Sequence, residues 1–310
     1  INGDLIFDVD IHRLMNFHKS HRAGVTLLAH PNDHPYDSSI IQTDCDGKVT
    51  GWLTKEEKRE WYHNCVNAGI HVISPKLLEK IDSPRKIDLD REILKPHIPS
   101  GQIFVYCSPE YVKDMGTPER IAQVEYDLKT GLVHQKNLGK KQKAIFLDRD
   151  GTINKYIGFL RKPEELELLE GAAKAICKIN QSGYLAIGAT NQPVIARGEV
   201  TWEGLEEIHR KLETLLGQEG AYLDDIFICP HHPDRNFLGE CPEYKVDCGC
   251  RKPKPGLLLR AAEKYNIDLA GSWMIGDSQR DVDAGTAAGC RTILLNKETG
   301  LLDAVKRIGL

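Results

Sequence analysis

The chain has 310 residues, a formal net charge of −4 and a pI near 6.3. Its length favours two domains, and its 41% hydrophobic and 28% charged residues are ordinary for a soluble globular protein. The acidic balance argues against a surface for nucleic acid or anionic membranes, and no apolar segment approaches the length of a membrane span.

Short apolar segments and turn signals predict a mixture of strands and helices in the first half. The chain opens with Ile1, not Met, inside a predicted strand, so we expect the natural N-terminus to be absent and leave a targeting signal open. The predicted elements that follow are a hairpin of Ser39–Thr43 and Val49–Leu53, a strand at Gly69–Ile73, a helix at Pro75–Ile81 and a helix that begins at Thr117.

Residues 133–143 are polar and basic without an apolar period, which predicts an exposed connection between a first domain (1–132) and a second (144–310). After this connection, short apolar segments alternate with amphipathic ones such as Leu205–Leu216 and Leu257–Tyr265. This alternation predicts an α/β domain with a doubly wound parallel sheet. The predicted strands are Ala144–Leu147, Tyr184–Ala189, Ile226–Cys229, Trp273–Ile275 and Thr292–Leu295.

Two carboxylates, Asp148 and Asp150, follow the first of these strands. Open α/β sheets bind ligands at the carboxyl ends of their strands. There, one carboxylate can attack phosphorus and form an aspartyl-phosphate, while the other acts as general acid and base. Taken alone, Asp-x-Asp-Gly also fits a turn or a calcium loop.

The next three strands also end in polar clusters, which are Thr190-Asn191-Gln192 with Arg197 nearby, Cys229-Pro230-His231-His232 and Gly276 to Asp281. Because the ends of parallel strands share one edge, these clusters should converge. Their residue types suit phosphate monoester hydrolysis. Asp148, Asp150 and Asp277 would hold one Mg²⁺, and the Thr190 hydroxyl and a lysine would bind phosphoryl oxygens. Asp281, one helical turn after Asp277, could orient a lysine or a metal-bound water.

Residues 144–297 resemble the haloacid-dehalogenase phosphatase superfamily. The first motif of the superfamily matches Asp148-Arg149-Asp150-Gly151-Thr152, the second matches Thr190, and the fourth matches Gly276-Asp277 through Asp281. The resemblance implies that Asp148 is the nucleophile, that Asp150 is the acid and base, and that Mg²⁺ is required.

A cysteine-rich loop follows the third predicted strand. Cys229, His231, Cys248 and Cys250 form a paired Cys₃His set that suits tetrahedral structural zinc, with free thiols as the alternative. Zinc would also tie down a long loop. The count of nine cysteines, with one tight cluster, fits a reduced, cytoplasmic protein better than a disulfide framework. His232 and Cys241 are spare ligand types in the same loop.

Arg251 and Lys252 end this loop, either as a solvated basic turn or as groups that zinc binding directs toward the phosphate edge. The segment Cys-x-His…Cys-x-Cys-Arg-Lys-Pro resembles two capless groups of the superfamily, the D-glycero-D-manno-heptose-1,7-bisphosphate 7-phosphatases and the histidinol-phosphate phosphatases. The resemblance implies phosphate or substrate contacts from Arg251 and Lys252, together with Thr190, Asn191 and Arg197.

Residues 1–130 resemble part of a sugar-phosphate nucleotidyltransferase, through Asn2-Gly3-Asp4, Asp44 to Lys55, Asn67 to Ile70 and Lys113 to Pro118. The resemblance implies that Asp4 and Asp114 are metal ligands and that Lys55 and Asn67 contact a sugar phosphate. No glycine-rich loop precedes Asn2, so we expect this domain to be incomplete here and to transfer no nucleotide.

A heptose 7-phosphatase yields a sugar 1-phosphate that a nucleotidyltransferase could activate, whereas a histidinol phosphatase has no such need. The fusion therefore favours a heptose bisphosphatase whose substrate is a small phosphorylated sugar. Three alternatives stay open: a histidinol-phosphate phosphatase, a nucleotidyltransferase as the main function, and a non-enzymatic zinc module. A homo-oligomer is also left open.

Overall fold

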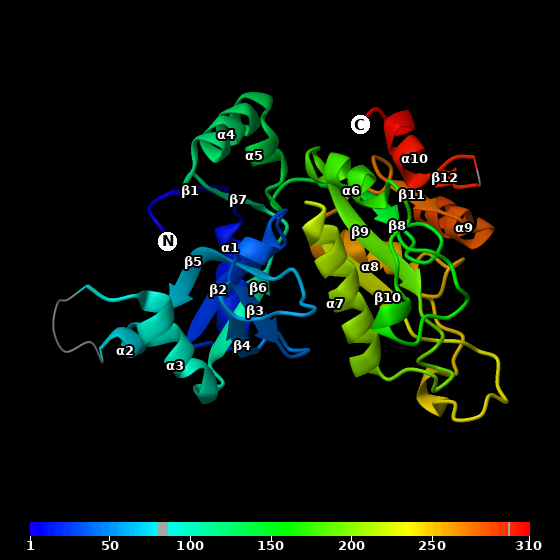
Figure 1. Cartoon of the computed structure of the whole chain (residues 1–310), viewed down its shortest axis with the longest axis horizontal. Coiled ribbons are helices and arrows are strands. Elements are labelled where there is room, and N and C mark those ends of the chain that lie inside the picture. Colours follow the sequence, from blue (N-terminus) through cyan, green and yellow to red (C-terminus); the bar gives the residue numbers. More distant parts are fainter. Residues whose placement is uncertain (80–85, 297) are drawn as a thin grey trace. The chain divides into compact units, whose positions relative to one another are not determined.

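The computed structural model describes residues 1–79, 86–296 and 298–310. They form two compact units, Ile1–Asn137 and Leu138–Leu310 (Figure 1). Each unit has its own sheet and its own hydrophobic core. Within the part of the chain that the structure describes, none of the helices combines the length and the apolar character needed to cross a membrane.

The N-terminal unit is built on a five-stranded sheet of order β4-β3-β5-β2-β6 and a separate antiparallel pair, β1-β7. In the larger sheet only β2 and β6 pair in parallel. The strands are β1 (Leu5–Asp8), β2 (Val25–His30), β3 (Ile40–Thr43), β4 (Val49–Leu53), β5 (Val66–Ile73), β6 (Ile103–Cys107) and β7 (Tyr111–Asp114). The predicted hairpin is confirmed as β3 and β4.

Alternate residues of β2 explain why this sheet is covered on both faces. Leu27 packs with Trp52 and Leu94 on one face, whereas Leu28 packs with Leu14 of α1 on the other. The helical elements of the unit are α1 (Ile11–Ser20), η1 (Pro35–Asp37), α2 (Pro75–Leu78), the π-helix η2 (Leu89–Leu94), α3 (Lys95–His97), η3 (Ile98–Ser100), α4 (Pro118–Thr130) and α5 (Leu132–Gln135).

Two helix predictions in this unit can be compared with the structure. The Thr117 side chain accepts a hydrogen bond from the Arg120 amide and caps α4, as the sequence predicts. The helix predicted at Pro75–Ile81 is present as the single turn α2, which ends at Leu78, and Ile81 lies outside the described residues.

The C-terminal unit is a five-stranded, all-parallel sheet of order β10-β9-β8-β11-β12, which confirms the doubly wound prediction. All five predicted strands occur, with ends that differ by at most two residues. They are β8 (Lys143–Leu147), β9 (Tyr184–Asn191), β10 (Asp225–Cys229), β11 (Trp273–Gly276) and β12 (Arg291–Leu294). The helical elements are η4 (Pro163–Glu165), α6 (Ala172–Asn180), α7 (Trp202–Gln218), η5 (Pro242–Tyr244), α8 (Gly256–Tyr265), α9 (Gln279–Ala288) and α10 (Leu301–Ile308).

The central strand β8 is apolar on both faces because helices cover both (Figure 1). Ile145 and Leu147 join a core with residues of α6, α7 and α10, whereas Ala144 and Phe146 join a core with residues of α8. All four side chains are fully buried. This two-sided burial explains why the strand reads as a continuous apolar segment and not as an alternation.

The segment predicted as an exposed connection, residues 133–143, is exposed only in part. Val133 lies in α5 and is buried, Leu138 packs into the C-terminal core with Phe146, and Lys143 already belongs to β8. The division between the two compact units falls between Asn137 and Leu138. The segment is rich in lysine, but two isolated apolar side chains were enough to anchor it.

Candidate active site

The site lies where the direction of strand order reverses. From β8 the chain adds β9 and β10 toward one edge of the sheet, and then β11 and β12 on the other side of β8. The carboxyl ends of β8 and β11 therefore flank a topological switch point, the usual ligand position in open α/β sheets. Asp148 follows β8, and Asp277 follows β11.

Three carboxylates meet at this point. Asp148, Asp277 and Asp281 each offer an oxygen, and these oxygens lie within 4.8 Å of one another. Such a set of hard oxygen donors fits Mg²⁺. The grouping includes Asp281, whereas the carboxylate of the predicted ligand Asp150 is turned toward Arg149 and Gln192.

Lys252 neutralises part of this negative charge. Its buried Nζ lies 2.8 Å from Asp148 Oδ1 and 2.6 Å from Asp281 Oδ1. Burial raises the pKa of Asp148 to about 6, although Lys252 opposes this shift. Burial lowers the pKa of Lys252, but Asp148 and Asp281 raise it more, so the net shift is upward and the lysine stays charged.

Asn191 fixes the position of this lysine. Its Oδ1 accepts a hydrogen bond from the Lys252 amide at 3.1 Å, and its Nδ2 donates to the Lys252 carbonyl at 3.0 Å. The side chain thus joins the end of β9 to the end of the cysteine-rich loop. Both polar ends of Asn191 hold main-chain atoms, so its predicted role as a phosphate ligand stays a prediction.

The other predicted phosphate contacts lie at different depths. The buried Thr190 Oγ1 accepts a hydrogen bond from Gln192 Nε2 at 2.8 Å. Arg251 Nη1 donates to the His231 carbonyl at 3.1 Å. Arg197 packs its guanidinium against the ring of Phe237, with 4.5 Å from Cζ to the ring centroid. These contacts hold the side chains in place, and none of them reaches the three carboxylates.

Gly151 is required by the close approach of the Asp148 loop to Asp277. Its φ is +82°, and a Cβ there would lie 2.0 Å from Asp277 Oδ2. We expect Gly151→Ala to displace Asp277 and lower phosphate release at least about tenfold, as loss of positioning does at other metal-dependent sites. The matched control is Gly158→Ala, which has a φ of +89° but nothing within 4 Å of the added Cβ.

The comparison separates a clash from backbone strain. Gly158→Ala should cost only about 1–2 kcal/mol of unfolding free energy, the usual penalty for a left-handed residue, with little change in turnover. Phosphate release and urea unfolding measured on both variants check this. Equal activity in the two variants would show that the Gly151–Asp277 approach is unimportant.

The cysteine-rich loop brings its four predicted ligands together. The sulfur of Cys250 lies 3.3 Å from that of Cys229, 3.2 Å from that of Cys248 and 3.4 Å from His231 Nδ1. In a tetrahedral zinc site, sulfurs about 2.3 Å from the metal are about 3.8 Å apart, so a small expansion would admit the ion. The hydrogen bond between Cys250 and Cys229 lowers the pKa of Cys250 to about 5, which favours a thiolate.

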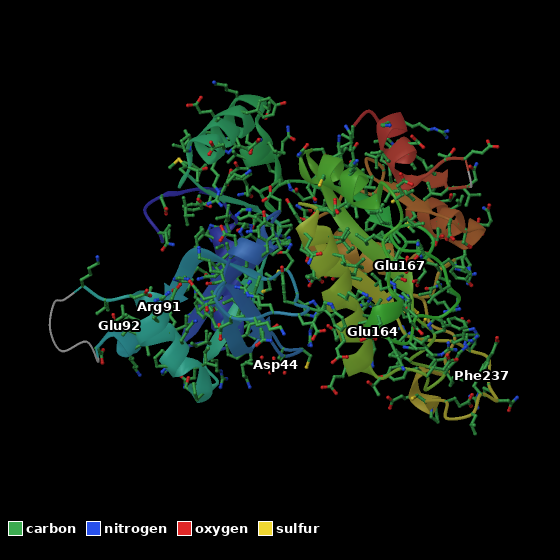
Figure 2. All side chains as sticks on the ribbon, in the orientation of Figure 1. Asp44, Arg91, Glu92, Glu164, Glu167 and Phe237 are labelled. Carbon is green, nitrogen blue, oxygen red and sulfur yellow. The ribbon has the colours of Figure 1, made fainter. Side chains whose placement is uncertain are left out.

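The spare residues of this loop have other contacts. His232 Nδ1 accepts a hydrogen bond from the Asp234 amide at 3.2 Å, and the Cys241 amide donates to the Ala196 carbonyl at 3.0 Å. Phe237 marks the outer part of the loop (Figure 2). Both Arg197 and Lys245 pack against its ring. The geometry therefore favours His231 over His232 as the fourth ligand.

The predicted metal ligands of the N-terminal unit lie on two neighbouring segments of the chain. Asp4 precedes β1 and Asp114 ends β7, and the Asp4 carbonyl accepts a hydrogen bond from the Met115 amide at 2.9 Å. The Asp114 carboxylate, however, accepts hydrogen bonds from Arg120 at 2.6 Å and from the Gly116 amide at 3.0 Å. A metal there would have to displace the arginine.

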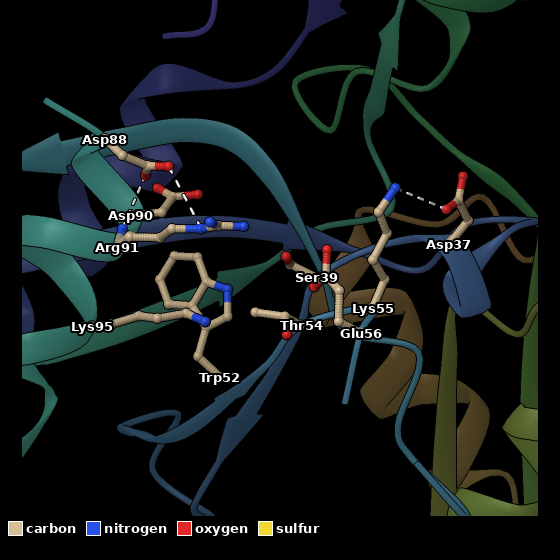
Figure 3. Close-up of a pocket in the computed structure, with 10 residues that line it drawn as sticks. All are labelled: Asp37, Ser39, Trp52, Thr54, Lys55, Glu56, Asp88, Asp90, Arg91 and Lys95. Carbon is tan, nitrogen blue, oxygen red and sulfur yellow. Dashed lines mark hydrogen bonds and ion pairs between the residues drawn. The ribbon is translucent and has the colours of Figure 1, made fainter. Parts of the chain in front are cut away.

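One of the two predicted sugar-phosphate residues, Lys55, lines a pocket of about 290 Å³ (Figure 3), and the other, Asn67, contacts a residue that lines it. Lys55 lines it directly and pairs with Asp37 at 3.3 Å. Asn67 donates to Asp90, another lining residue, at 3.2 Å. The remaining lining residues are Ser39, Trp52, Thr54, Glu56, Asp88, Arg91 and Lys95.

Comparison with known proteins identifies the second unit. The HAD-hyrolase-like family model matches residues 249–307. The D-glycero-beta-D-manno-heptose-1,7-bisphosphate 7-phosphatase of Yersinia pestis is 40% identical over 152 residues, which are 49% of this chain and 79% of that protein. The chain belongs to this family of phosphatases. Its members are phosphoric monoester hydrolases, and the match accounts for about half of the chain.

Solved structures give matches to parts of the chain. The D,D-heptose 1,7-bisphosphate phosphatase from B. bronchiseptica, complexed with magnesium and phosphate, is 34% identical, covers 54% of this chain and 98% of its own, and has a TM-score of 0.47. HddC from Yersinia pseudotuberculosis is 21% identical, covers 41% of this chain and 53% of its own, and has a TM-score of 0.34.

Proposed function

We propose that this chain hydrolyses the 7-phosphate of D-glycero-D-manno-heptose 1,7-bisphosphate through an aspartyl-phosphate on Asp148. The observation that carries the proposal is the placement of Asp148 at the switch point, with the Lys252 ammonium 2.8 Å from its carboxylate. A nucleophilic carboxylate that must meet a phosphate dianion needs such a fixed positive charge. Membership of the 7-phosphatase family supports the choice of substrate.

The reaction has two displacements. An oxygen of Asp148 attacks phosphorus, the bond from phosphorus to the sugar oxygen breaks, and Asp150 gives that oxygen a proton. Water then attacks the phosphorus of the aspartyl-phosphate, the bond to Asp148 breaks, and Asp150 takes the proton of the water as inorganic phosphate leaves. Lys252 and the Thr190 hydroxyl would bind the phosphoryl oxygens in both steps.

Asp148 and Asp277 would hold Mg²⁺. The sequence also predicts Asp150 as a ligand, but Arg149 and Gln192 hold both of its carboxylate oxygens, so we assign Asp150 to proton transfer. When bound, the ion would offset the charge that builds up on the phosphoryl oxygens. Asp281 lies in the same carboxylate group and pairs with Lys252 at 2.6 Å, but it is buried, whereas Asp148 and Asp277 are more accessible. We therefore assign Asp281 to the orientation of the lysine, which leaves the other carboxylates for the ion.

The substrate is tested by phosphate release from heptose 1,7-bisphosphate, heptose 7-phosphate and histidinol phosphate. We expect efficient release from the bisphosphate and much slower release from the other two. Preferred hydrolysis of histidinol phosphate would contradict the assignment and favour the alternative within the same superfamily. Release from none of the three, in the presence of Mg²⁺, would contradict the activity itself.

A structural zinc ion on Cys229, His231, Cys248 and Cys250 is part of the proposal. Elemental analysis should find about one zinc per chain, as this ligand set requires. Cys248→Ser should lower the zinc content and the activity, because the loop also carries Lys252 into the site. The matched control is Cys241→Ser, since Cys241 is in the same loop but outside the ligand group.

The two variants should differ in zinc content, which should fall in Cys248→Ser and stay unchanged in Cys241→Ser. Full zinc content in Cys248→Ser, or equal zinc loss in Cys241→Ser, would contradict the ligand set. Added Mg²⁺ should restore neither the zinc nor the activity of Cys248→Ser, because the ions take different ligands.

We include a cytoplasmic location in the proposal. It fits the cysteines, most of which are exposed or partly exposed and all of which are free thiols in the structure.

The N-terminal unit supports a second candidate function, the handling of a sugar 1-phosphate. The convergence of Lys55 and the Asn67 partner Asp90 on one pocket favours it. Pyrophosphate release from heptose 1-phosphate with a panel of nucleoside triphosphates tests whether the chain is bifunctional. We expect none from this chain, because residues 1–143 contain no glycine-rich loop whose backbone amides could hold the nucleotide phosphates. Activity would show that the nucleotide binds elsewhere.

A further inference from the structure

Arg149, between the two reactive aspartates, has one of the largest fully buried side chains in the described residues, at 1% exposure. Its neighbours Asp148 and Asp150 are more accessible. A guanidinium cannot lose its proton, so burial is tolerable only when its charge is paired and its donors are used. The mechanism proposed above gives roles to Asp148 and Asp150 but none to the arginine between them.

Asp150 provides the pairing charge. Arg149 Nη2 donates to Asp150 Oδ1 at 3.0 Å and to Oδ2 at 2.9 Å, and Nε donates to Oδ1 at 3.2 Å. Both carboxylate oxygens are therefore held by one planar group. Contacts of this kind fix the direction of a carboxylate as well as its distance, which a lysine could not do.

Gln192 closes the arrangement. Its Oε1 accepts a hydrogen bond from Arg149 Nη2 at 3.0 Å, and its Nε2 donates to Asp150 Oδ2 at 2.8 Å. Arg149, Asp150 and Gln192 thus form a closed triangle at the ends of β8 and β9. Nε2 also donates to the Thr190 hydroxyl, so the same amide contacts a predicted phosphate ligand.

The arginine is also anchored from the helix beneath the sheet edge. Arg149 Nη1 lies 3.1 Å from Nε2 of His209, a buried residue of α7. Asn154 Nδ2 donates to Asp150 Oδ1 at 3.0 Å from the other side. The Asp150 carboxylate is therefore held by donors from Arg149, Gln192 and Asn154.

We propose that Arg149 is a positioning residue that, with Gln192, fixes the direction of the Asp150 carboxylate for its second task, taking a proton from the attacking water. The inference rests on the phosphatase activity proposed above. Asp150 must give a proton in the first displacement and take one in the second, so its direction matters twice. A substrate whose leaving group needs no proton isolates the second task.

The test uses p-nitrophenyl phosphate, because p-nitrophenolate leaves without a proton from Asp150. We expect Arg149→Met to lower steady-state turnover about 10- to 100-fold, as loss of an outer positioning partner does elsewhere. Because only the second displacement slows, KM should fall in proportion and kcat/KM should stay nearly unchanged. The aspartyl-phosphate should then accumulate, so rapid mixing should show a burst of about one nitrophenolate per site. With heptose bisphosphate, turnover should fall at least as far.

Gln192→Met is the second variant, and it keeps the buried Arg149–Asp150 pair in case loss of the arginine prevents folding. It should show the same burst with a smaller loss of turnover. The matched control is Arg291→Met, since Arg291 packs on Trp273 where β12 begins, at the opposite end of the sheet. It should behave as the wild type does.

Wild-type turnover in folded Arg149→Met, or a reduced turnover without a burst in both variants, would overturn the positioning role. Failure of the substrate assignment looks different. In that case the wild type hydrolyses p-nitrophenyl phosphate but not heptose bisphosphate, and the comparison of Arg149→Met and Gln192→Met with the aryl substrate still decides the inference.

Discussion

Asp148→Asn should abolish phosphate release from heptose bisphosphate while the chain stays folded. The amide has almost the same shape as the carboxylate but cannot form the aspartyl-phosphate, so we expect turnover to fall by several orders of magnitude. Folding should survive because Lys252 keeps its second partner, Asp281, at 2.6 Å.

Phosphate release and thermal unfolding check this expectation together. The matched control is Asp283→Asn, because Asp283 is exposed on α9 and lies outside the carboxylate group. Its turnover should stay within about twofold of the wild type, as for most surface substitutions. Near-normal release by Asp148→Asn would exclude the residue as nucleophile and require a different route.

The sheet of the second unit was predictable because its central strand is buried on both faces. The continuous apolar segment before Asp148 indicates such a strand, and parallel strands bring their carboxyl ends to one edge. The proximity of Asp148, Asp277 and Asp281 follows from this topology alone. The spacing of the cysteines likewise predicted a cluster that the fold does assemble.

The side-chain partners within the site were harder to predict. Nothing in the sequence around Asn191 shows that its amide holds the main chain of Lys252, 61 residues later. Arg149 looks like a charged loop residue, yet it is buried under the sheet edge. Such contacts depend on which strand ends become neighbours, whereas local patterns report only on nearby residues.

The exposure of the segment between the units was overestimated for a related reason. Its lysines and glutamines indicate solvent, but Leu138 is 2% exposed because it packs on a core that is built from later strands. A single apolar side chain has no periodicity to detect. Burial at such positions becomes visible only once the receiving surface exists.

Lys252→Met should cause the second large loss, in both activity and stability. Lys252 is the charged group that lies between Asp148 and Asp281, at 2.8 and 2.6 Å. Without it, the buried carboxylate of Asp281 and the partly buried carboxylate of Asp148 face each other and the incoming phosphate. Removing one partner of a buried ion pair typically costs about 3–5 kcal/mol of unfolding free energy. Removing one preorganised donor to a reacting oxygen typically lowers turnover about 10²–10³-fold.

The matched control for this variant is two residues away. Lys254 is largely exposed and pairs with the exposed Asp247, so Lys254→Met should change the unfolding free energy by less than about 1 kcal/mol. Urea unfolding and phosphate release measured on both variants separate the buried charge from the surface charge. If Lys252→Met kept its stability and lost only activity, the lysine would serve the phosphate alone. If both variants behaved alike, the ion pairs at Asp148 and Asp281 would carry neither function.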